Sequence, residues 1–174
     1  IECSGKPKGA KIALSFPSVG ATENIILAAV TAEGVTEISN AAREPEITDL
    51  AEFLNKCGGD IRGAGGGNIV IHGVKKLHGC EYTIMPDRIA CATFLACTAS
   101  AGGEITAKKC DPKHLDAVLS VFEQMGCRIH TLSDTICFSA KKPLKAVDTV
   151  RTMVYPGFPT DCQAFVMAAL CKAE

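Results

Sequence analysis

Three short polar stretches each stand directly after a proline, at a point where an apolar, helix-like run begins. Proline suits the first turn of a helix. The unpaired N–H groups of that turn, together with the positive end of the helix dipole, can bind an anion. The chemistry indicated by these residues is therefore the binding of an anionic group. The three stretches are Ser18-Val19-Gly20, Asp87-Arg88 and Thr160-Asp161.

The first stretch allows two interpretations. Ser18 can cap the free N–H groups of the helix that follows it, which is the usual role of a serine at a helix start. Alternatively, the same N–H groups can hold a phosphate, since Gly20 has no side chain to keep an anion away from the backbone. Taken alone, the stretch favours the cap.

The elements that position these stretches follow from an internal repeat. Residues 33–61 align without gaps on residues 101–129 at a shift of 68, so that Gly58 meets Gly126. Each copy predicts a short strand, an amphipathic helix that ends at its glycine, and two further strands. The strands that can be placed from the pattern are 35–39, 68–73, 104–109 and 135–140.

A second kind of helix lies upstream of each copy. It is rich in alanine, cysteine, threonine and leucine around most of its circumference, which is typical of a buried helix. The repeat unit is then strand, buried helix, strand, surface helix, strand, strand, over about 70 residues, and the fold class is α/β. If the repeats pack about an approximate symmetry axis, the buried helices point their N-termini the same way. Several positive helix ends in one cleft suit a multiply charged anion, which brings the anion interpretation level with the cap.

The composition excludes several classes of function. The 174 residues include 18 basic and 19 acidic ones, and the net charge is −1. This gives no electrostatic reason to expect nucleic acid or an anionic membrane as a partner. No apolar run approaches the roughly 20 residues of a membrane helix, and no signal peptide opens the sequence. No metal site is expected, because none of the cysteines forms a Cys-x-x-Cys pair.

The ten cysteines stand mostly among apolar residues, as Cys97, Cys137 and Cys171 do. Free cysteine behaves as a small buried hydrophobe. The pattern therefore predicts unpaired thiols that fill the core in a reducing compartment, rather than a disulfide framework. The expected location is the cytoplasm.

With these residues laid out, the sequence resembles the enolpyruvyl transferases, and among them those that act on UDP-N-acetylglucosamine in peptidoglycan synthesis. The matching stretches occur in family order and span essentially the whole chain. They are "PSVGATENI" (17–25), "NAAREPEITDLAEFLN" (40–55), "GAGGGNIVIHGV" (63–74), "PDRIACATFL" (86–95) and "YPGFPTDCQA" (155–164). The resemblance implies an inside-out α/β barrel built from such repeats, in a two-lobed cleft enzyme.

The resemblance also implies a reaction and roles for residues. Phosphoenolpyruvate would give its enolpyruvyl group to the 3-hydroxyl of UDP-N-acetylglucosamine and release phosphate, without a cofactor. The segment that holds the nucleotide diphosphate would be Ser18, Val19 and Gly20, so the cap and the phosphate interpretations can both hold. Asp161 would be the general base beside the sugar hydroxyl. The further substrate-binding residues around the cleft would be Glu44, Glu46, Asp87, Arg88 and Thr160.

The charged residues among these also have plain structural interpretations. Asp161 can be an acidic residue favoured by the positive end of a helix. Glu44 and Glu46 can form the charged first turn of a helix. Asp87 and Arg88 can form a local ion pair or anchor a hinge.

The repeat boundary and the resemblance together place a division at Met85-Pro86. Residues 1–85 are expected to belong to a first, nucleotide-sugar lobe, and residues 86–174 to a second, truncated lobe. The resemblance puts the family's proton-donating loop cysteine and its phosphoenolpyruvate-binding arginines outside this chain, so we expect an internal piece of a longer protein. Two alternatives stay open. The piece alone is inactive or only binds the nucleotide sugar, or the parent is the shikimate-pathway enolpyruvyl transferase. The pattern predicts no oligomeric state.

Overall fold

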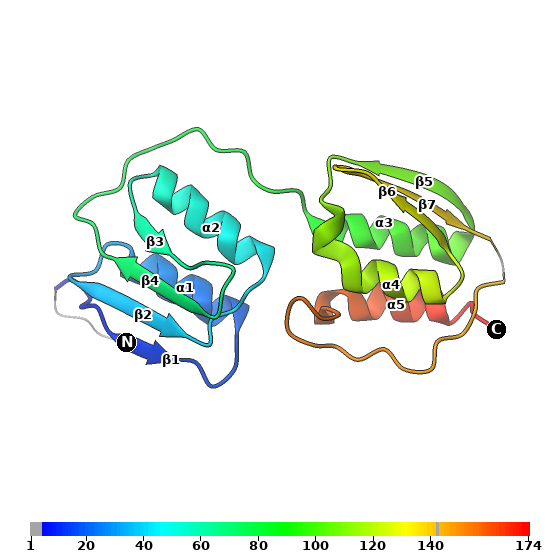
Figure 1. The fold of residues 1–174 in the computed structure, drawn as a ribbon, viewed down its shortest axis with the longest axis horizontal. Coiled ribbons are helices and arrows are strands. Elements are labelled where there is room, and N and C mark those ends of the chain that lie inside the picture. The colour runs from blue at the N-terminus through cyan, green and yellow to red at the C-terminus, as the bar shows by residue number, and fades with distance from the viewer. Residues whose placement is uncertain (1–4, 142) are drawn as a thin grey trace. The chain divides into compact units, whose positions relative to one another are not determined.

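A computed structural model describes residues 5–141 and 143–174 of the chain. The chain divides into two compact units, Ile1–Met85 and Pro86–Glu174. In each unit, helices pack on a small β-sheet (Figure 1). The described residues thus form a mixed α/β fold, as the repeat predicted.

The first unit has the predicted order of strand, helix, strand, helix, strand, strand. Its sheet has the order β1-β2-β4-β3, in which β1 and β2 are parallel and the other neighbours antiparallel. Both helices pack against this sheet and against each other. The elements are β1 (Lys11–Ala13), α1 (Val19–Ala29), β2 (Val35–Ser39), α2 (Pro45–Lys56), β3 (Asp60–Arg62) and β4 (Asn68–His72).

The second unit repeats this order from its first helix onward. Its antiparallel sheet has the order β5-β7-β6, with α3 and α4 packed on it and α5 packed on α3. Among the described residues, no strand precedes α3 as β1 precedes α1. The elements are α3 (Arg88–Ala101), β5 (Gly103–Lys108), the 3₁₀ turn η1 (Pro112–Leu115), α4 (Asp116–Gln124), β6 (Arg128–Thr131), β7 (Thr135–Ala140), the 3₁₀ turn η2 (Thr160–Cys162) and α5 (Gln163–Leu170).

The ends of the amphipathic helices lie where the glycines predicted them. Gly58 follows α2 with a φ of 96°, and Gly126 follows α4 with a φ of 88°. Only glycine adopts this left-handed backbone without steric cost, so the helices stop there and the chain turns back to the sheet. Two other residues with left-handed backbone follow strands at matching places of the two units, Asn40 with a φ of 56° and Lys109 with a φ of 55°.

Each unit has its own core, and α1 and α3, which were predicted to be buried, are covered around most of their circumference but keep one exposed stripe. The cores are built around fully buried side chains such as Ile26 and Ile71 in the first unit and Leu95 in the second. On the outer faces of α1 and α3, however, Leu27 is 52% exposed and Phe94 is 61% exposed. The expected burial thus holds around most of each circumference and fails along the stripe that contains these two side chains.

The cysteines follow the prediction in part. The nine described cysteines are all free, and four of them are buried, as expected of small core residues: Cys57, Cys110, Cys127 and Cys162. The burial expected of two of the three examples was wrong. Cys97 and Cys171 are exposed and Cys137 is half-buried. Cys97 is exposed because it lies one turn from Phe94 on the outer face of α3.

Candidate substrate site at the helix N-termini

The candidate residues of the first unit gather at one edge of its sheet. Because β1 and β2 are parallel and are followed by α1 and α2, both helices begin beyond the carboxyl ends of these strands. A hydrogen bond of 3.1 Å from the backbone N–H of Ala42 to Oγ1 of Thr22 joins the two helix starts. Ser18 precedes α1 and Glu44 precedes α2, so this edge carries both positions.

The start of α1 confirms the cap and leaves room for an anion. The hydroxyl oxygen of Ser18 accepts a hydrogen bond of 3.3 Å from the N–H of Ala21, from an extended backbone that is typical of an N-cap. Val19 is half-buried and Gly20 is exposed. A Cβ placed on Gly20 would meet no atom within 4 Å, so the backbone is open to an approaching group. Phosphate binding here stays a prediction.

The start of α2 has the form of a charged first turn. Glu44 occupies the N-cap position without a side-chain cap hydrogen bond, Pro45 is the first helical residue, and Glu46 lies in the first turn. Both glutamates are half-buried. Carboxylates are stabilised at this positive end of a helix, so the structural interpretation is sufficient to explain them.

One cation at this edge was missed by the sequence reasoning. Arg43 precedes Glu44, and one of its guanidinium nitrogens lies 3.0 Å from where a Cβ would stand on Gly67. The backbone N–H of Ala41 donates 2.9 Å to the carbonyl of Gly67, which holds the glycine-rich loop at the same place. A guanidinium here can pair with a phosphate. The sequence signal that could have indicated this cation is that Arg43 is the single basic residue of "NAAREPEITD".

The start of α3 in the second unit is capped more strongly. The Oδ1 of Asp87 accepts hydrogen bonds of 2.9 Å from the N–H of Ile89 and 3.0 Å from that of Ala90. Arg88 is only 5% exposed, and its guanidinium carbon lies 5.6 Å from the ring centroid of Tyr155. This is a cation–π contact, and the sequence reasoning gave Tyr155 no role.

The same end of α3 packs against η2, which carries the remaining candidates. Thr160 and Asp161 are exposed, whereas Cys162 is fully buried. Burial raises the pKa of the Cys162 thiol to about 11, the Arg88 guanidinium acts to lower this pKa, and the Asp161 carboxylate acts to raise it. Arg88 and Asp161 are thus both within electrostatic range of one sulfur.

The structure therefore brings the candidate residues together in two groups. Ser18, Val19, Gly20, Glu44 and Glu46 lie at one edge of the first unit. The residues of the second unit that lie at the α3–η2 contact are Asp87, Arg88, Thr160 and Asp161. That the two groups face a common cleft stays a prediction.

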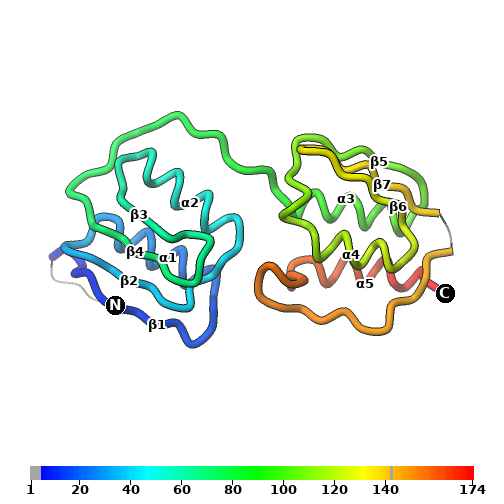
Figure 2. The backbone as a smooth tube through the Cα atoms, viewed as in Figure 1, coloured from blue at the N-terminus to red at the C-terminus, as the bar shows by residue number. Residues whose placement is uncertain are grey.

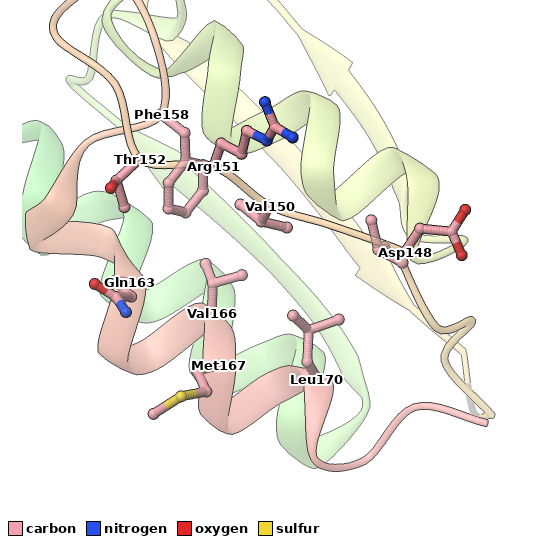
Figure 3. A pocket seen from close by; sticks show the side chains of 10 residues that line it. Asp148, Val150, Arg151, Thr152, Phe158, Gln163, Val166, Met167 and Leu170 are labelled. Atoms are coloured by element: carbon pink, nitrogen blue, oxygen red, sulfur yellow. The ribbon is translucent and has the colours of Figure 1, made fainter.

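The second unit has a hollow of about 540 Å³ (Figure 3). It is lined by residues of the stretch 147–152 and by one side of α5, with Val150, Phe158 and Val166 among its apolar side chains. Neither Thr160 nor Asp161 lines it. The hollow is mostly apolar and is not the predicted anion site.

The described residues also answer whether this part of the chain has a metal site or a membrane-spanning helix. Within them, no group of three or more histidine, cysteine, aspartate and glutamate side chains is arranged to hold a metal ion. None of their helices is both long enough and apolar enough to cross a membrane.

Comparison with known proteins supports the resemblance. A protein of Caldanaerobacter subterraneus subsp. tengcongensis named UDP-N-acetylglucosamine 1-carboxyvinyltransferase 2 is 50% identical over 175 residues, which is 100% of this chain and 42% of that protein. UDP-N-acetylglucosamine 1-carboxyvinyltransferase 1 of Symbiobacterium thermophilum is 52% identical over 96% of this chain and 38% of its own length. The chain thus spans about two fifths of these curated relatives.

Solved structures show the same fold at low sequence identity. The enolpyruvyl transferase NikO from Streptomyces tendae superposes with a TM-score of 0.77 at 23% identity, over 96% of this chain and 43% of that one. EPSP synthase from Acinetobacter baumannii gives a TM-score of 0.55 at 22% identity, over 93% of this chain and 36% of that one. The predicted fold class of the enolpyruvyl transferases is confirmed.

The family described as EPSP synthase (3-phosphoshikimate 1-carboxyvinyltransferase) matches residues 1–174. This match spans both units and all of the candidate residues. The chain therefore belongs to the EPSP synthase family of enolpyruvyl transferases.

Proposed function

We propose that the protein containing this chain transfers the enolpyruvyl group of phosphoenolpyruvate to the 3-hydroxyl of UDP-N-acetylglucosamine and releases phosphate, for peptidoglycan synthesis in a bacterium. The observation that supports this best is the identity of 50% and 52% to two proteins named for that sugar nucleotide. The candidate residues have the matching chemistry, since helix N-termini suit phosphates and an exposed carboxylate suits a proton transfer.

In the first unit, the start of α1 is the proposed site of the diphosphate. Ser18 uses one lone pair as a cap, which leaves its hydroxyl hydrogen free to donate to a phosphate oxygen. The open backbone at Gly20 allows that phosphate to approach the N–H groups. Arg43, at the start of α2 on the same edge, adds a cation for the same negative charge. The acidic Glu44 and Glu46 are proposed to contact the polar parts of the substrate rather than its phosphates.

In the second unit, Asp161 is the proposed general base. An ionised carboxylate takes the proton of the sugar hydroxyl as the hydroxyl oxygen bonds to the enolpyruvyl carbon. The bond from that carbon to the phosphate oxygen breaks, and phosphate leaves. Arg88, at the α3–η2 contact, is proposed to attract an anionic group. Thr160 is proposed to donate a hydrogen bond to the substrate beside Asp161. Asp87 holds the start of α3, and thereby Arg88, in place.

The two units are proposed to belong to different lobes of the whole enzyme. The first, 1–85, would carry most of the nucleotide-sugar contacts, and the second, 86–174, the base. The free thiols of the nine described cysteines agree with a reducing compartment, and we place the protein in the cytoplasm.

A second acceptor has specific support. The family description names 3-phosphoshikimate, and EPSP synthase is among the structural neighbours. The test is phosphate release by the full-length protein from phosphoenolpyruvate, with UDP-N-acetylglucosamine or shikimate 3-phosphate as acceptor and with neither as the blank. We expect turnover with the sugar nucleotide alone. Turnover with shikimate 3-phosphate alone contradicts the proposal. Calorimetry of residues 1–174 with the sugar nucleotide tests separately whether this piece binds without turnover.

A further inference from the structure

Two cysteine side chains of the first unit touch although they are 23 residues apart. The sulfur of Cys57 lies 3.4 Å from the sulfur of Cys80, and both cysteines are free. Cys57 is the C-cap residue of α2 and is buried. Cys80 is half-buried and belongs to the irregular connecting segment, residues 73–85, which leads from β4 to the second unit.

The backbone around the two sulfurs holds them at this separation. The N–H of His78 donates 2.9 Å to the carbonyl of Cys57 itself, and the His78 ring lies over Gly58, 3.0 Å from where a Cβ would stand. Further along the connecting segment, the hydroxyl of Tyr82 donates 2.9 Å to the carboxylate of Asp49 on α2. The connecting segment is thus held to α2 by contacts on both sides of Cys80. Its path can be followed in Figure 2.

We propose that Cys57 and Cys80 are a redox modification site, at which a reversible disulfide locks the connecting segment onto the end of α2. The two sulfurs need to approach from 3.4 Å to the bond length of about 2.05 Å. A small movement of the half-exposed segment suffices, because Cys57 is fixed in the helix end and Cys80 is not in a helix or strand.

The oxidant is a low-molecular-weight disulfide such as oxidised glutathione. Cys80 loses its proton and its thiolate attacks one sulfur of the oxidant, which releases one molecule of the small thiol and leaves a mixed disulfide on Cys80. Cys57 then loses its proton and attacks the Cys80 sulfur, which releases the second small thiol. The two protein thiols together lose two protons and two electrons, and the oxidant gains both as it becomes two small thiols.

The order of attack follows from exposure. Cys80 is the more accessible sulfur, whereas burial, together with the hydrogen bond to Cys80, raises the pKa of the Cys57 thiol. A thiol with a raised pKa is a slow first nucleophile but reacts readily with a disulfide held next to it.

A second pair in the other unit supplies an internal comparison. Cys91 on α3 and Cys110 after β5 are close enough for their thiols to interact by a hydrogen bond and electrostatically. Burial is the main cause that raises the pKa of Cys91 to about 12. The Cys110 thiol, which is buried, also points at the carbonyls of Ala107 at 3.6 Å and Asp134 at 3.7 Å. Cys91 is half-buried like Cys80, but it is fixed within α3 and its thiol has a raised pKa, so we expect this pair to oxidise far less.

The test uses the full-length protein, equilibrated in buffers of graded oxidised-to-reduced glutathione ratio, then alkylated and mapped by mass spectrometry. We expect the disulfide-linked Cys57–Cys80 peptide to be at least roughly tenfold more abundant than any other disulfide-linked pair. The reason is that two sulfurs held next to each other react at a high effective concentration. Brief trypsin cleavage at the exposed Lys75 or Lys76 should then leave two fragments that separate only after reduction. Excess reduced glutathione should restore both thiols.

Matched variants make the outcome specific. Cys80→Ser should abolish the linked peptide and the joined fragments, while Cys97→Ser, at an exposed cysteine on α3, should change neither. The proposal is overturned if Cys80 accumulates only as the mixed disulfide with glutathione. It is equally overturned if the Cys91–Cys110 peptide is as abundant, or if no linked peptide forms at any ratio.

Discussion

Removal of the Asp87 cap tests whether the start of α3 is held by this carboxylate. Asp87→Ala deletes the acceptor of two hydrogen bonds, from the N–H groups of Ile89 at 2.9 Å and Ala90 at 3.0 Å. Loss of an aspartate N-cap costs about 1 kcal/mol, within a range of roughly 0.5–2. Loss of the negative charge at the positive helix end adds about 0.3–1 kcal/mol. Because both hydrogen bonds have near-ideal lengths, we expect a loss of about 1.5 kcal/mol.

Asp87→Asn separates the cap from the charge. Asparagine keeps an oxygen that can accept the same hydrogen bonds, so only the charge contribution of about 0.5 kcal/mol is lost. Ser18→Ala is the matched control in the other unit, since Ser18 accepts a single, longer hydrogen bond of 3.3 Å. We expect its loss to be about 0.5 kcal/mol, and to be confined to the start of α1.

The assay is amide hydrogen exchange, resolved to the first turn of each helix. An opening free energy that falls by about 1.4 kcal/mol speeds exchange roughly tenfold, so Asp87→Ala should speed exchange at Ile89 and Ala90 by about that factor. Asp87→Asn should speed it by about twofold. Unchanged exchange in Asp87→Ala would show that the carboxylate does not hold the helix start, and the proposed positioning of Arg88 through Asp87 would be wrong.

Three other predictions concern stability. Burial is the main cause, and the hydrogen-bonded Asp49 carboxylate the next, that raise the pKa of the Tyr82 hydroxyl from 10 to about 12. The free energy of unfolding should therefore fall as the pH rises from 10 to about 12. Tyr82→Phe should remove that fall in alkaline unfolding, and an identical alkaline profile would contradict the assignment. Lys109→Asn should raise the free energy of unfolding, measured in urea, by about 0.5 kcal/mol, because Lys109 has the left-handed backbone that Asn40 adopts in the first unit. A free energy of unfolding below that of the unsubstituted protein would refute this. Phe122→Ala, at a fully buried ring, should cost about 3–5 kcal/mol in the same assay, against little for Leu132→Ala, which is 55% exposed; near-equal losses refute the core assignment.

The secondary structure was predictable because its signals are local and occur twice. The strand predicted at 35–39 is β2, and the strand predicted at 135–140 is β7, each with the expected bounds. Gly58 and Gly126 ended their helices as predicted, since the left-handed backbone that both adopt is a property of the residue type. The structure also divides the chain at Met85-Pro86, although the assignment of the two units to different lobes stays a prediction.

The packing was less predictable, because composition does not say which neighbour covers a face. An apolar composition around most of α3 predicted burial without saying where the exposed stripe would lie, and Phe94 on that stripe is 61% exposed. The contact between Cys57 and Cys80 depends on the path of an irregular segment, for which the sequence has no periodic signal. In the candidate site, the cap at Ser18 was predicted from local rules, whereas Asp87 was interpreted as part of an ion pair or a hinge and is the N-cap of α3. The cation–π contact of Arg88 was not, since its partner lies far along the chain.

The central claim is that Asp161 takes the proton of the sugar hydroxyl. Asp161→Asn in the full-length protein keeps the size of the side chain at this exposed position of η2 but cannot accept that proton. The measurement is turnover by phosphate release, together with the affinity for UDP-N-acetylglucosamine by calorimetry. We predict that turnover falls by about 10²–10⁴-fold, as for the loss of a general base, while the affinity changes much less. Near-normal turnover in Asp161→Asn would contradict the account and leave Asp161 an acidic residue at a helix start.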